Sequence, residues 1–392
     1  MTIGGSTIEA ELASLSPWRD VAPPITAAER LARIEAARAA MAAAGMDALL
    51  VGAGPSLRYF TGVTWSPTER LVALLLRPAG DPIVICPAFE LGSLEAELAI
   101  PADIRLWQED EAPTALVADA VPTRARLGID PLLPFATAER LRASHQLVDA
   151  APVIDGLRMR KSPAELALMA QAKAMTLEVH RRAARILAPG IRASTVRRFI
   201  DDAHRALGAA GSTFCAVQFG RATAFPHGLP GDQLLEENQL VLVDTGCLVD
   251  GYHSDITRTY AFGEVGAEVR ATWDIEHAAQ AAAFAAVRPG ASCESVDAAA
   301  RAVLEREGLG PDYRLPGLPH RTGHGIGLSI HEPAYLVRGD RTVLEPGMCF
   351  SNEPMIVVPD RYGVRLEDHF HVTDTGAAWF TEPQPSIDRP FN

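Results

Sequence analysis

The chain contains few cysteines and no excess of basic residues, and both shortages exclude classes of protein. Its five cysteines are isolated and odd in number, which argues against a disulfide framework and favours reduced thiols in the cytosol. The formal net charge is −13 with both signs interspersed, so the surface lacks the basic face that nucleic acid requires and disfavours anionic membranes. We therefore expect a cytoplasmic protein that binds neither nucleic acid nor membrane.

Long hydrophobic runs are also missing. No segment reaches the roughly 18 consecutive apolar residues that span a bilayer. Residues 1–20 show no basic region followed by an apolar one, so we expect no signal peptide. The composition, 48% hydrophobic and 22% charged, is that of a globular protein, and a length of 392 residues favours two domains.

Residues 1–155 show short apolar runs that alternate with helical patterns. The runs at 48–54, 71–78 and 82–87 are bounded by Gly, Pro or Asp, which is typical of strands. Residues 27–45 are rich in helix-forming residues and end at a glycine. We predict an α/β domain here, without a chemical motif of its own.

Residues 156–392 form the second predicted domain and contain an internal repeat. Residues 180–211 and 277–308 share one plan, in which an Ala-rich helix stopped by Pro-Gly is followed by a second helix that ends in glycine. Each unit leads to an apolar strand that carries a carboxylate, at 240–246 and 348–354. A repeat of this length predicts an α+β domain with an internal pseudo-two-fold axis rather than a solenoid, which needs more and shorter units.

Two aspartates flank a predicted hairpin in the first half of this domain. Asp250-Gly251 is a strong signal for a two-residue turn between the strands. That turn places Asp244 opposite Thr257, with Asp255 one diagonal step away on the same face, whereas a one-residue bulge places the two aspartates opposite each other. Either register brings two carboxylates together on a side predicted to be buried, where a bound cation would offset their repulsion and lost hydration.

The second half supplies further polar groups near strand ends. Glu353 ends one strand, and Arg365 and Glu367 share a face of a later strand by period-two alternation. Segment 320–333 lies between the carboxylate-bearing strands of the two repeat units. It carries spaced glycines that allow the backbone to approach another group closely. The two halves therefore place carboxylates in similar positions.

Taken singly, these groups have simpler explanations. Asp255 could form an ion pair with Arg258, three residues further along the chain. A single histidine in segment 320–331 is more often a hydrogen-bonded structural residue than a ligand. Four carboxylates and a histidine at strand ends of a duplicated domain favour a metal site over these separate explanations.

The motifs DTGCLVDGYHSDITRT, HRTGHGIGLSIHEP, NEP and GVRLED together resemble the creatinase/aminopeptidase metallopeptidases, the M24-type family with the pita-bread fold. That family includes methionine aminopeptidase, aminopeptidase P, prolidase and creatinase, and the resemblance covers residues 156–392. The preceding α/β domain resembles the N-terminal domain that prolidase, aminopeptidase P and creatinase share. By motif, the resemblance implies five metal ligands: Asp244, Asp255, His324, Glu353 and Glu367.

The resemblance also implies a cofactor and a reaction. Oxygen-rich ligation with a single imidazole suits a pair of divalent ions, with Mn²⁺ expected and Co²⁺, Fe²⁺ or Zn²⁺ also compatible. A metal-bridging hydroxide would attack the scissile carbonyl, with Glu353 taking and returning the proton. His227 and His331 match the family's substrate-side histidines and would stabilise the oxyanion. Arg365 would orient ligating carboxylates such as Asp255.

Within the family, the favoured interpretation is a prolidase, which hydrolyses Xaa-Pro dipeptides. Arg338 lies fifteen residues before Glu353, close to where prolidases carry an arginine for the free C-terminal carboxylate, although a solvated loop arginine is an equally simple explanation. The complete ligand set disfavours creatinase chemistry and non-catalytic binding proteins, and the front domain disfavours a methionine aminopeptidase. Aminopeptidase P, or a related hydrolase that acts on a non-peptide amide, remains the alternative.

One stretch departs from the family's pattern. After the catalytic glutamate the family often has Glu-Pro-Gly-x-Tyr, whereas Met355 and Val357 stand here in place of the glycine and the tyrosine. We expect altered substrate placement but intact hydrolysis, because the ligands are present. The resemblance further implies short proline-containing peptides as substrates and a homodimer, with the segment around Trp65 reaching the partner's cleft.

Overall fold

The computed structural model describes residues 3–19 and 21–391. These residues divide into two compact units by their internal contacts. Unit 2 is Pro24–Arg158, and unit 1 combines the described residues of Met159–Asn392 with those of the N-terminal segment Met1–Pro23. Among the described residues, no helix combines the length and the apolar character needed to cross a membrane.

Unit 2 is built on a six-stranded mixed sheet with the strand order β4-β3-β2-β1-β5-β6. The central strands are buried along their whole length, as expected for the continuous apolar runs of the sequence, because helices cover both faces of such a sheet. The strands are β1 (Ala48–Gly52), β2 (Ala73–Leu76), β3 (Ile83–Pro87), β4 (Asp103–Trp107), β5 (Arg126–Ile129) and β6 (Gln146–Asp149). The helices are α2 (Ala27–Ala43), α3 (Pro55–Thr61), η1 (Ala88–Glu90), α4 (Leu91–Glu97), α5 (Thr114–Ala120), α6 (Phe135–Arg142) and α7 (Ala151–Arg158).

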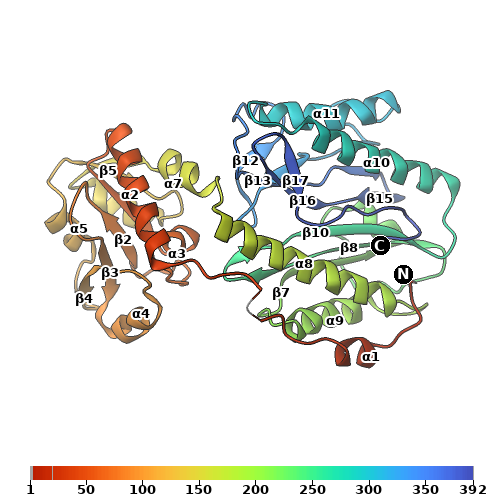
Figure 1. The fold of residues 1–392 in the computed structure, drawn as a ribbon, viewed down its shortest axis with the longest axis horizontal. Helices are drawn as coiled ribbons and strands as arrows, with labels where there is room; N and C mark the ends of the chain where they lie inside the picture. The colour runs from red at the N-terminus through yellow and green to blue at the C-terminus, as the bar shows by residue number, and fades with distance from the viewer. Residues whose placement is uncertain (1–2, 20, 392) are drawn as a thin grey trace. The chain divides into compact units, whose positions relative to one another are not determined.

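Unit 1 is a duplicated α+β structure in which each half packs two long helices on its own sheet. Figure 1 shows the strands between the two helix pairs, with α8 and α9 on one side and α10 and α11 on the other. Each half has its own hydrophobic core between its helices and its sheet. The α/β and duplicated α+β classes predicted from the sequence are both confirmed.

The first half contains a sheet with the order β10-β8-β7, and β9 pairs with β8. The N-terminal helix α1 (Ile8–Ala13) packs against α9. The elements of this half are α8 (Pro163–Arg185), α9 (Ala193–Ala206), β7 (Ser212–Phe219), η2 (Gly220–Ala224), β8 (Gln239–Val249), β9 (Tyr252–His253) and β10 (Ile256–Phe262).

The second half contains a sheet with the order β12-β11-β13-β16-β17 and a separate β14-β15 hairpin. Its elements are α10 (Ala267–Ala286), α11 (Cys293–Arg306), β11 (Gly323–Gly325), β12 (Glu332–Leu336), β13 (Cys349–Asn352), β14 (Met355–Val358), β15 (Tyr362–Arg365), β16 (Asp368–Val372) and β17 (Ala377–Trp379).

The hydrogen bonds at the two Pro-Gly turns show the internal symmetry directly. Gly190 N donates to Leu235 O at 2.7 Å, and Gly290 N donates to Leu344 O at 3.0 Å. Each turn also receives a bond back, from Leu235 N to Ile191 O and from Leu344 N to Ala291 O. The same backbone pattern therefore precedes the strand of each half that carries a carboxylate.

Candidate active site

The first two carboxylates come from the β8–β10 hairpin. Asp244 in β8 lies opposite Thr257 in β10, which is the register expected for a two-residue Asp250-Gly251 turn without a bulge. Asp255 directly precedes β10 and is buried. The hairpin thus brings both aspartates to one end of the sheet.

The second pair of carboxylates occupies matching positions in the other half. Asp244 lies nine residues after Leu235, and Glu353 lies nine residues after Leu344, the residues that bond to the two Pro-Gly turns (244 − 235 = 353 − 344 = 9). Glu367 directly precedes β16, as Asp255 precedes β10. Backbone pairing between Thr257 and Glu367 joins the halves, so the internal symmetry brings all four carboxylates together.

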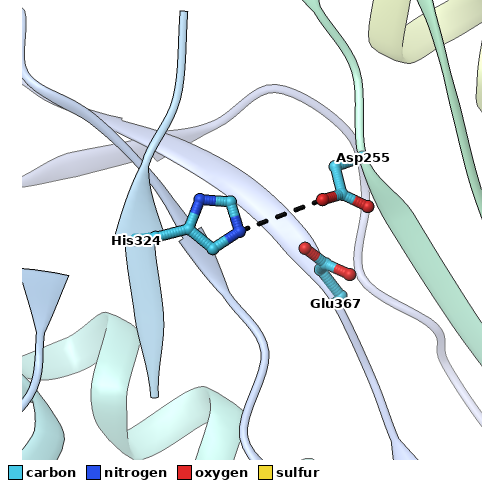
Figure 2. Close-up of side chains that lie close together, drawn as sticks. All are labelled: Asp255, His324 and Glu367. Carbon is cyan, nitrogen blue, oxygen red and sulfur yellow. Dashed lines mark ion pairs between the residues drawn. The ribbon is translucent and has the colours of Figure 1, made fainter. Parts of the chain in front are cut away.

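Three of the predicted ligands form a close cluster. One ligand atom from each of Asp255, His324 and Glu367 lies within 4.8 Å of the other two. Figure 2 shows the imidazole of His324 pointing toward both carboxylates, and its Nε2 lies 3.9 Å from Asp255 Oδ2. His324 lies in β11, whereas Asp255 directly precedes β10 and Glu367 directly precedes β16. The cluster therefore draws on both halves of unit 1, and all three side chains are buried.

Hydrogen bonds orient the cluster. His324 Nδ1 lies 2.9 Å from Gly325 O, so this nitrogen is the donor and Nε2 faces the acids. His324 Nε2 is also 3.1 Å from Glu353 Oε1, a contact that requires either the imidazole proton or a cation between the two atoms. Thr257 Oγ1 donates to Glu367 Oε2 at 2.7 Å and fixes that carboxylate.

The electrostatics of the cluster favour a cation. Burial, and then the nearby charge of Glu367, raise the pKa of Asp255 well above its usual value. Burial and the charge of Glu353 raise the pKa of Glu367 in the same direction. For Glu353, burial alone would raise the pKa, but the hydrogen bond and charge of His324 outweigh it and lower the pKa to about 2. Positive charge close to these acids is therefore strongly stabilised.

Several buried oxygens of the site have no hydrogen-bond partner among the residues that the structure describes. These atoms are Asp244 Oδ1, Asp255 Oδ1 and Glu367 Oε1. Buried polar atoms are nearly always satisfied, and unmatched carboxylate oxygens beside an imidazole nitrogen fit a divalent metal ion. The residues present therefore suit the metal that the sequence motifs imply.

Two buried arginines contact the acids of this region, and neither forms an ion pair with Asp255. Arg365 Nη2 donates to Asp244 Oδ2 at 2.5 Å, and its Nε donates to Thr257 Oγ1 at 3.1 Å. Arg365 therefore orients one of the candidate ligating carboxylates, and that carboxylate is Asp244 rather than the example named from the sequence, Asp255. Arg258 pairs with Asp368 at 2.7 Å, with both side chains fully buried. The simpler explanation for Asp255, an ion pair with Arg258, does not hold because Arg258 is bound elsewhere.

A cleft of about 760 Å³ opens over the cluster. The exposed side chains of His227, from the loop after η2, and His331, from the loop before β12, line it. The rings of His331 and His324 meet edge to face, with centroids 4.3 Å apart. Burial, and then the charges of His324 and Arg321, lower the pKa of His331 to about 4, so this imidazole is neutral at pH 7 and donates one N–H.

Arg338 does not lie in the cleft. Its side chain is exposed, forms an ion pair with Asp312 and lies over the ring of Tyr313, 5.4 Å from the centroid. Tyr313 lines the cleft, but Arg338 is not among the residues that do. This position favours the simpler explanation, that of a loop arginine bound to a neighbouring carboxylate.

Sequence reasoning missed several residues that shape the cleft. His320 and Arg321 belong to the same glycine-rich segment as His324, so the motif itself was the available signal. Phe214 and Ile330 form apolar walls, and no local pattern distinguishes them from ordinary core residues. Met355, which replaces the family's glycine, is buried with its Sδ 3.7 Å from Arg365 Nη1.

Comparison with known proteins gives two matches that together span most of the chain. Residues 167–374 match metallopeptidase family M24, and residues 33–160 match the creatinase/prolidase N-terminal domain. The first match covers the four carboxylates, His324 and the cleft histidines His227, His320 and His331.

Individual relatives align over nearly their whole length. A probable dipeptidase PepE of Mycobacterium tuberculosis is 39% identical over 358 residues, which is 88% of this chain and 92% of the relative. An Xaa-Pro dipeptidase of Lactobacillus helveticus is 33% identical over 344 residues, 85% of this chain and 92% of the relative. The crystal structure of dipeptidase PepE from Mycobacterium ulcerans superimposes with a TM-score of 0.84 at 37% identity and covers 91% of this chain and 96% of that one.

Proposed function

This chain belongs to metallopeptidase family M24, and from that premise we propose that it hydrolyses Xaa-Pro dipeptides. The reaction would use two divalent metal ions, and we expect both to be Mn²⁺. The observation that carries the proposal is the buried Asp255, His324 and Glu367 cluster at the base of an open cleft. Relatives named dipeptidase and Xaa-Pro dipeptidase support the choice of substrate.

Charge supports more than one ion. Asp244, Asp255, Glu353 and Glu367 carry four negative charges when ionised, and Arg365, paired with Asp244, offsets one of them, which leaves more negative charge than a single divalent ion balances. With His324 Nε2 they would provide the ligand atoms, and Arg365 holds Asp244 in place. When bound, such ions lower the pKa of a water molecule and polarise the scissile carbonyl.

The protein's own groups divide the remaining work. Glu353, less buried than Asp255 and Glu367 and lining the cleft, takes the proton of the attacking water and passes it to the leaving nitrogen. His331 donates its N–H to the carbonyl oxygen as negative charge develops there. His227, on the exposed rim, contacts the peptide from the loop after η2. Phe214 and Ile330 exclude water from the side chains of the substrate.

A metal-reconstituted assay tests this proposal. Purified protein loaded with Mn²⁺ is offered Leu-Pro, Leu-Pro-Pro and Leu-Ala, and we expect hydrolysis of Leu-Pro well above that of the other two. Preference for Leu-Pro-Pro would assign the chain to aminopeptidase P chemistry. No turnover of any peptide with Mn²⁺, Co²⁺, Fe²⁺ or Zn²⁺ would refute a peptidase function.

A further inference from the structure

His369 is a buried histidine beside the cluster that has no role in the proposed function. It lies in β16, two residues after Glu367, so the alternation of the strand directs both side chains to the same face of the sheet. On the neighbouring strand β13 it pairs with Ser351, whose Oγ accepts a hydrogen bond from His324 N at 2.9 Å. His369 is fully buried. It therefore belongs to the layer of side chains that contains the candidate ligands.

The imidazole of His369 has no hydrogen-bond partner on either ring nitrogen within residues 3–19 and 21–391. Its Nε2 lies 3.6 Å from Glu367 Oε1, which has no hydrogen-bond partner in this part of the chain either. Three unpaired polar atoms are thus buried together, although buried polar atoms are nearly always paired. An apolar residue would fill the same space without this cost, so the arrangement indicates a role at the site.

The contact between His369 and Glu367 has a defined direction. An ionised carboxylate only accepts hydrogen bonds, so the ring nitrogen that faces it, Nε2, is the donor. The separation exceeds a usual N–H···O bond by roughly 0.6 Å, which a small turn of the ring or of the carboxylate would close. The other oxygen of this carboxylate, Oε2, accepts from Thr257 Oγ1 at 2.7 Å. His369 and Thr257 thus flank Glu367, one at each oxygen.

His369 is placed to act on a metal ion through Glu367 rather than as a ligand itself. Among the described residues, the group whose ligand atoms all lie within 4.8 Å of one another is Asp255, His324 and Glu367, and His369 is not part of it. Each carboxylate oxygen has two lone pairs, so Glu367 Oε1 can accept the imidazole N–H and still bind an ion. A carboxylate that is held at both oxygens loses less freedom when the ion arrives, which favours binding.

We propose that His369 is a positioning residue of the metal site. Its Nε2–H holds Oε1 of Glu367 while Thr257 holds Oε2, and together they fix the carboxylate in the orientation in which it binds an ion. The inference rests on the metal site of the proposed function and adds a residue to it. Because it concerns the binding of the ion and not the choice of peptide, the two can fail separately.

Metal affinity tests this role without any peptide. Metal-free wild type, H369L, H369Q and H371L are titrated with Mn²⁺ by calorimetry. For H369L we expect the apparent Kd for Mn²⁺ to rise roughly 10- to 100-fold, because leucine fills the space but has no N–H. H369Q should recover most of that loss, since its amide is a donor. An unchanged affinity in H369L, or an equal loss in H369L and H369Q, would refute the role of the N–H.

H371L is the matched control. His371 lies in the same strand and on the same face as His369, but it is partly exposed, and its ring packs on Phe380 with centroids 5.2 Å apart. This variant should bind Mn²⁺ like the wild type. A loss of the same size as in H369L would show a general effect of the strand and overturn the proposal.

Stability and spectroscopy separate positioning from a structural role. Without metal, H369L should unfold at the same temperature as the wild type or at a higher one, because the substitution removes buried unpaired nitrogens. Marked destabilisation of both H369L and H369Q would show a structural residue instead. In the Zn²⁺-loaded wild type, nitrogen–proton correlation NMR should place the ring proton of His369 on Nε2, and an Nε2 without a proton would contradict the proposal.

Peptide turnover shows which of the two proposals fails. If the wild type cleaves Leu-Pro while H369L binds Mn²⁺ as tightly as the wild type, the role of His369 is refuted and the proposed function stands. If the wild type cleaves no Xaa-Pro dipeptide, but H369L loses Mn²⁺ affinity and H369Q regains it, the proposed function is refuted and the role of His369 stands.

Discussion

At the scale of single residues, the site combines strong repulsion with incomplete hydrogen bonding. Asp255 and Glu367 are buried close together, and each has an oxygen without a hydrogen-bond partner in the described part of the chain. Leaving such atoms unpaired costs about 1–3 kcal/mol each, more when they are charged. A bound cation would offset the repulsion between the carboxylates and provide a partner for the unpaired oxygens. We therefore expect Asp255 and Glu367 to contribute to stability only when the metal is present.

Asp255→Asn tests the ligand assignment. The amide keeps the size of the side chain but loses the charge, so we expect metal content to fall and activity on Leu-Pro to drop by at least about 100-fold. Elemental analysis and steady-state kinetics measure the two effects.

Asp250→Asn is the matched control for this change. Asp250 is exposed at the turn of the same hairpin with φ of 45°, a conformation that asparagine also adopts readily. The control should keep both metal and activity. Full turnover by the Asp255 variant would contradict its assignment as a ligand.

At the scale of elements, the β8–β10 hairpin positions its aspartates through a very close backbone contact. A Cβ added at Gly246, within β8, would lie 1.9 Å from Ser254 O. Ser254 directly precedes Asp255, so the contact decides how closely the first two ligands approach. Only glycine permits it.

Gly246→Ala is expected to force the strands apart. We expect the free energy of unfolding to fall by about 1–3 kcal/mol or more and the Mn²⁺ affinity to decrease. Gly92→Ala, in helix α4 with no atom within 4 Å of the added Cβ, is the control and should be neutral or stabilising by up to about 1 kcal/mol. Equal effects of the two substitutions on metal affinity would refute the role of this contact.

A buried histidine couples helices α8 and α9 to strand β7. His204 Nε2 lies 3.0 Å from Thr176 Oγ1 and its Nδ1 lies 2.9 Å from Ser212 Oγ. Burial lowers the pKa of His204 from 6.5 to about 4, so between these values the unfolded chain binds a proton that the folded chain does not. This histidine therefore lowers stability as the pH falls from 6.5 toward 4.

His204→Gln removes this titration. At pH 7 the variant should be less stable than wild type because it loses hydrogen bonds. The difference should shrink by up to about 3 kcal/mol as the pH is lowered to 4, because only the wild type bears the protonation penalty. Denaturant titrations at several pH values measure it. A difference that stays constant with pH would contradict the lowered pKa.

At the scale of the whole molecule, the proposed metal site draws its candidate ligands from the two halves of unit 1. Asp244 and Asp255 come from the first half, and His324, Glu353 and Glu367 come from the second. The bonds that link the halves across the site include the Thr257–Glu367 pairing, the bond from Thr259 Oγ1 to Arg365 O and the bond from Arg365 to Asp244. Metal binding should therefore stabilise unit 1 as one body.

Hydrogen exchange with and without Mn²⁺ tests this distribution. We expect the metal to slow amide exchange in β8, β10, β13 and β16 and to raise the melting temperature, because binding to the folded state alone stabilises it. Strands β1–β3 of unit 2 contain no ligand and should exchange at unchanged rates. Protection spread evenly over both units, or none in the four strands, would contradict a site confined to unit 1.

Much of this organisation could be predicted from local patterns. The family resemblance rested on four short motifs and is confirmed by the M24 match over residues 167–374. Of the two registers left open for the Asp250-Gly251 turn, the structure has the one without a bulge, which places Asp244 opposite Thr257. Such features depend on neighbours within a few residues, which a sequence displays directly.

Other contacts were not predictable because they join distant segments. The sequence suggested Arg258 as a partner for Asp255, but Arg258 bonds to Asp368, 110 residues away. It suggested Arg338 for the substrate carboxylate, but Arg338 pairs with Asp312 and is not among the residues that line the cleft. The partners of Arg258 and Arg338 are set by proximity in the folded structure, which cannot be read from charge or from spacing along the chain.

The sequence by itself determined the elements, the duplication and the identity of the acidic and imidazole groups, because hydrophobic period, turn residues and motif spacing act over short stretches of chain. Tertiary structure alone decided which of the described oxygens remain unpaired, which carboxylate Arg365 holds across 121 residues, and which arginines line the cleft. The physical reason is that burial and electrostatic contacts depend on which side chains pack together, and this is settled only when both halves have folded against each other.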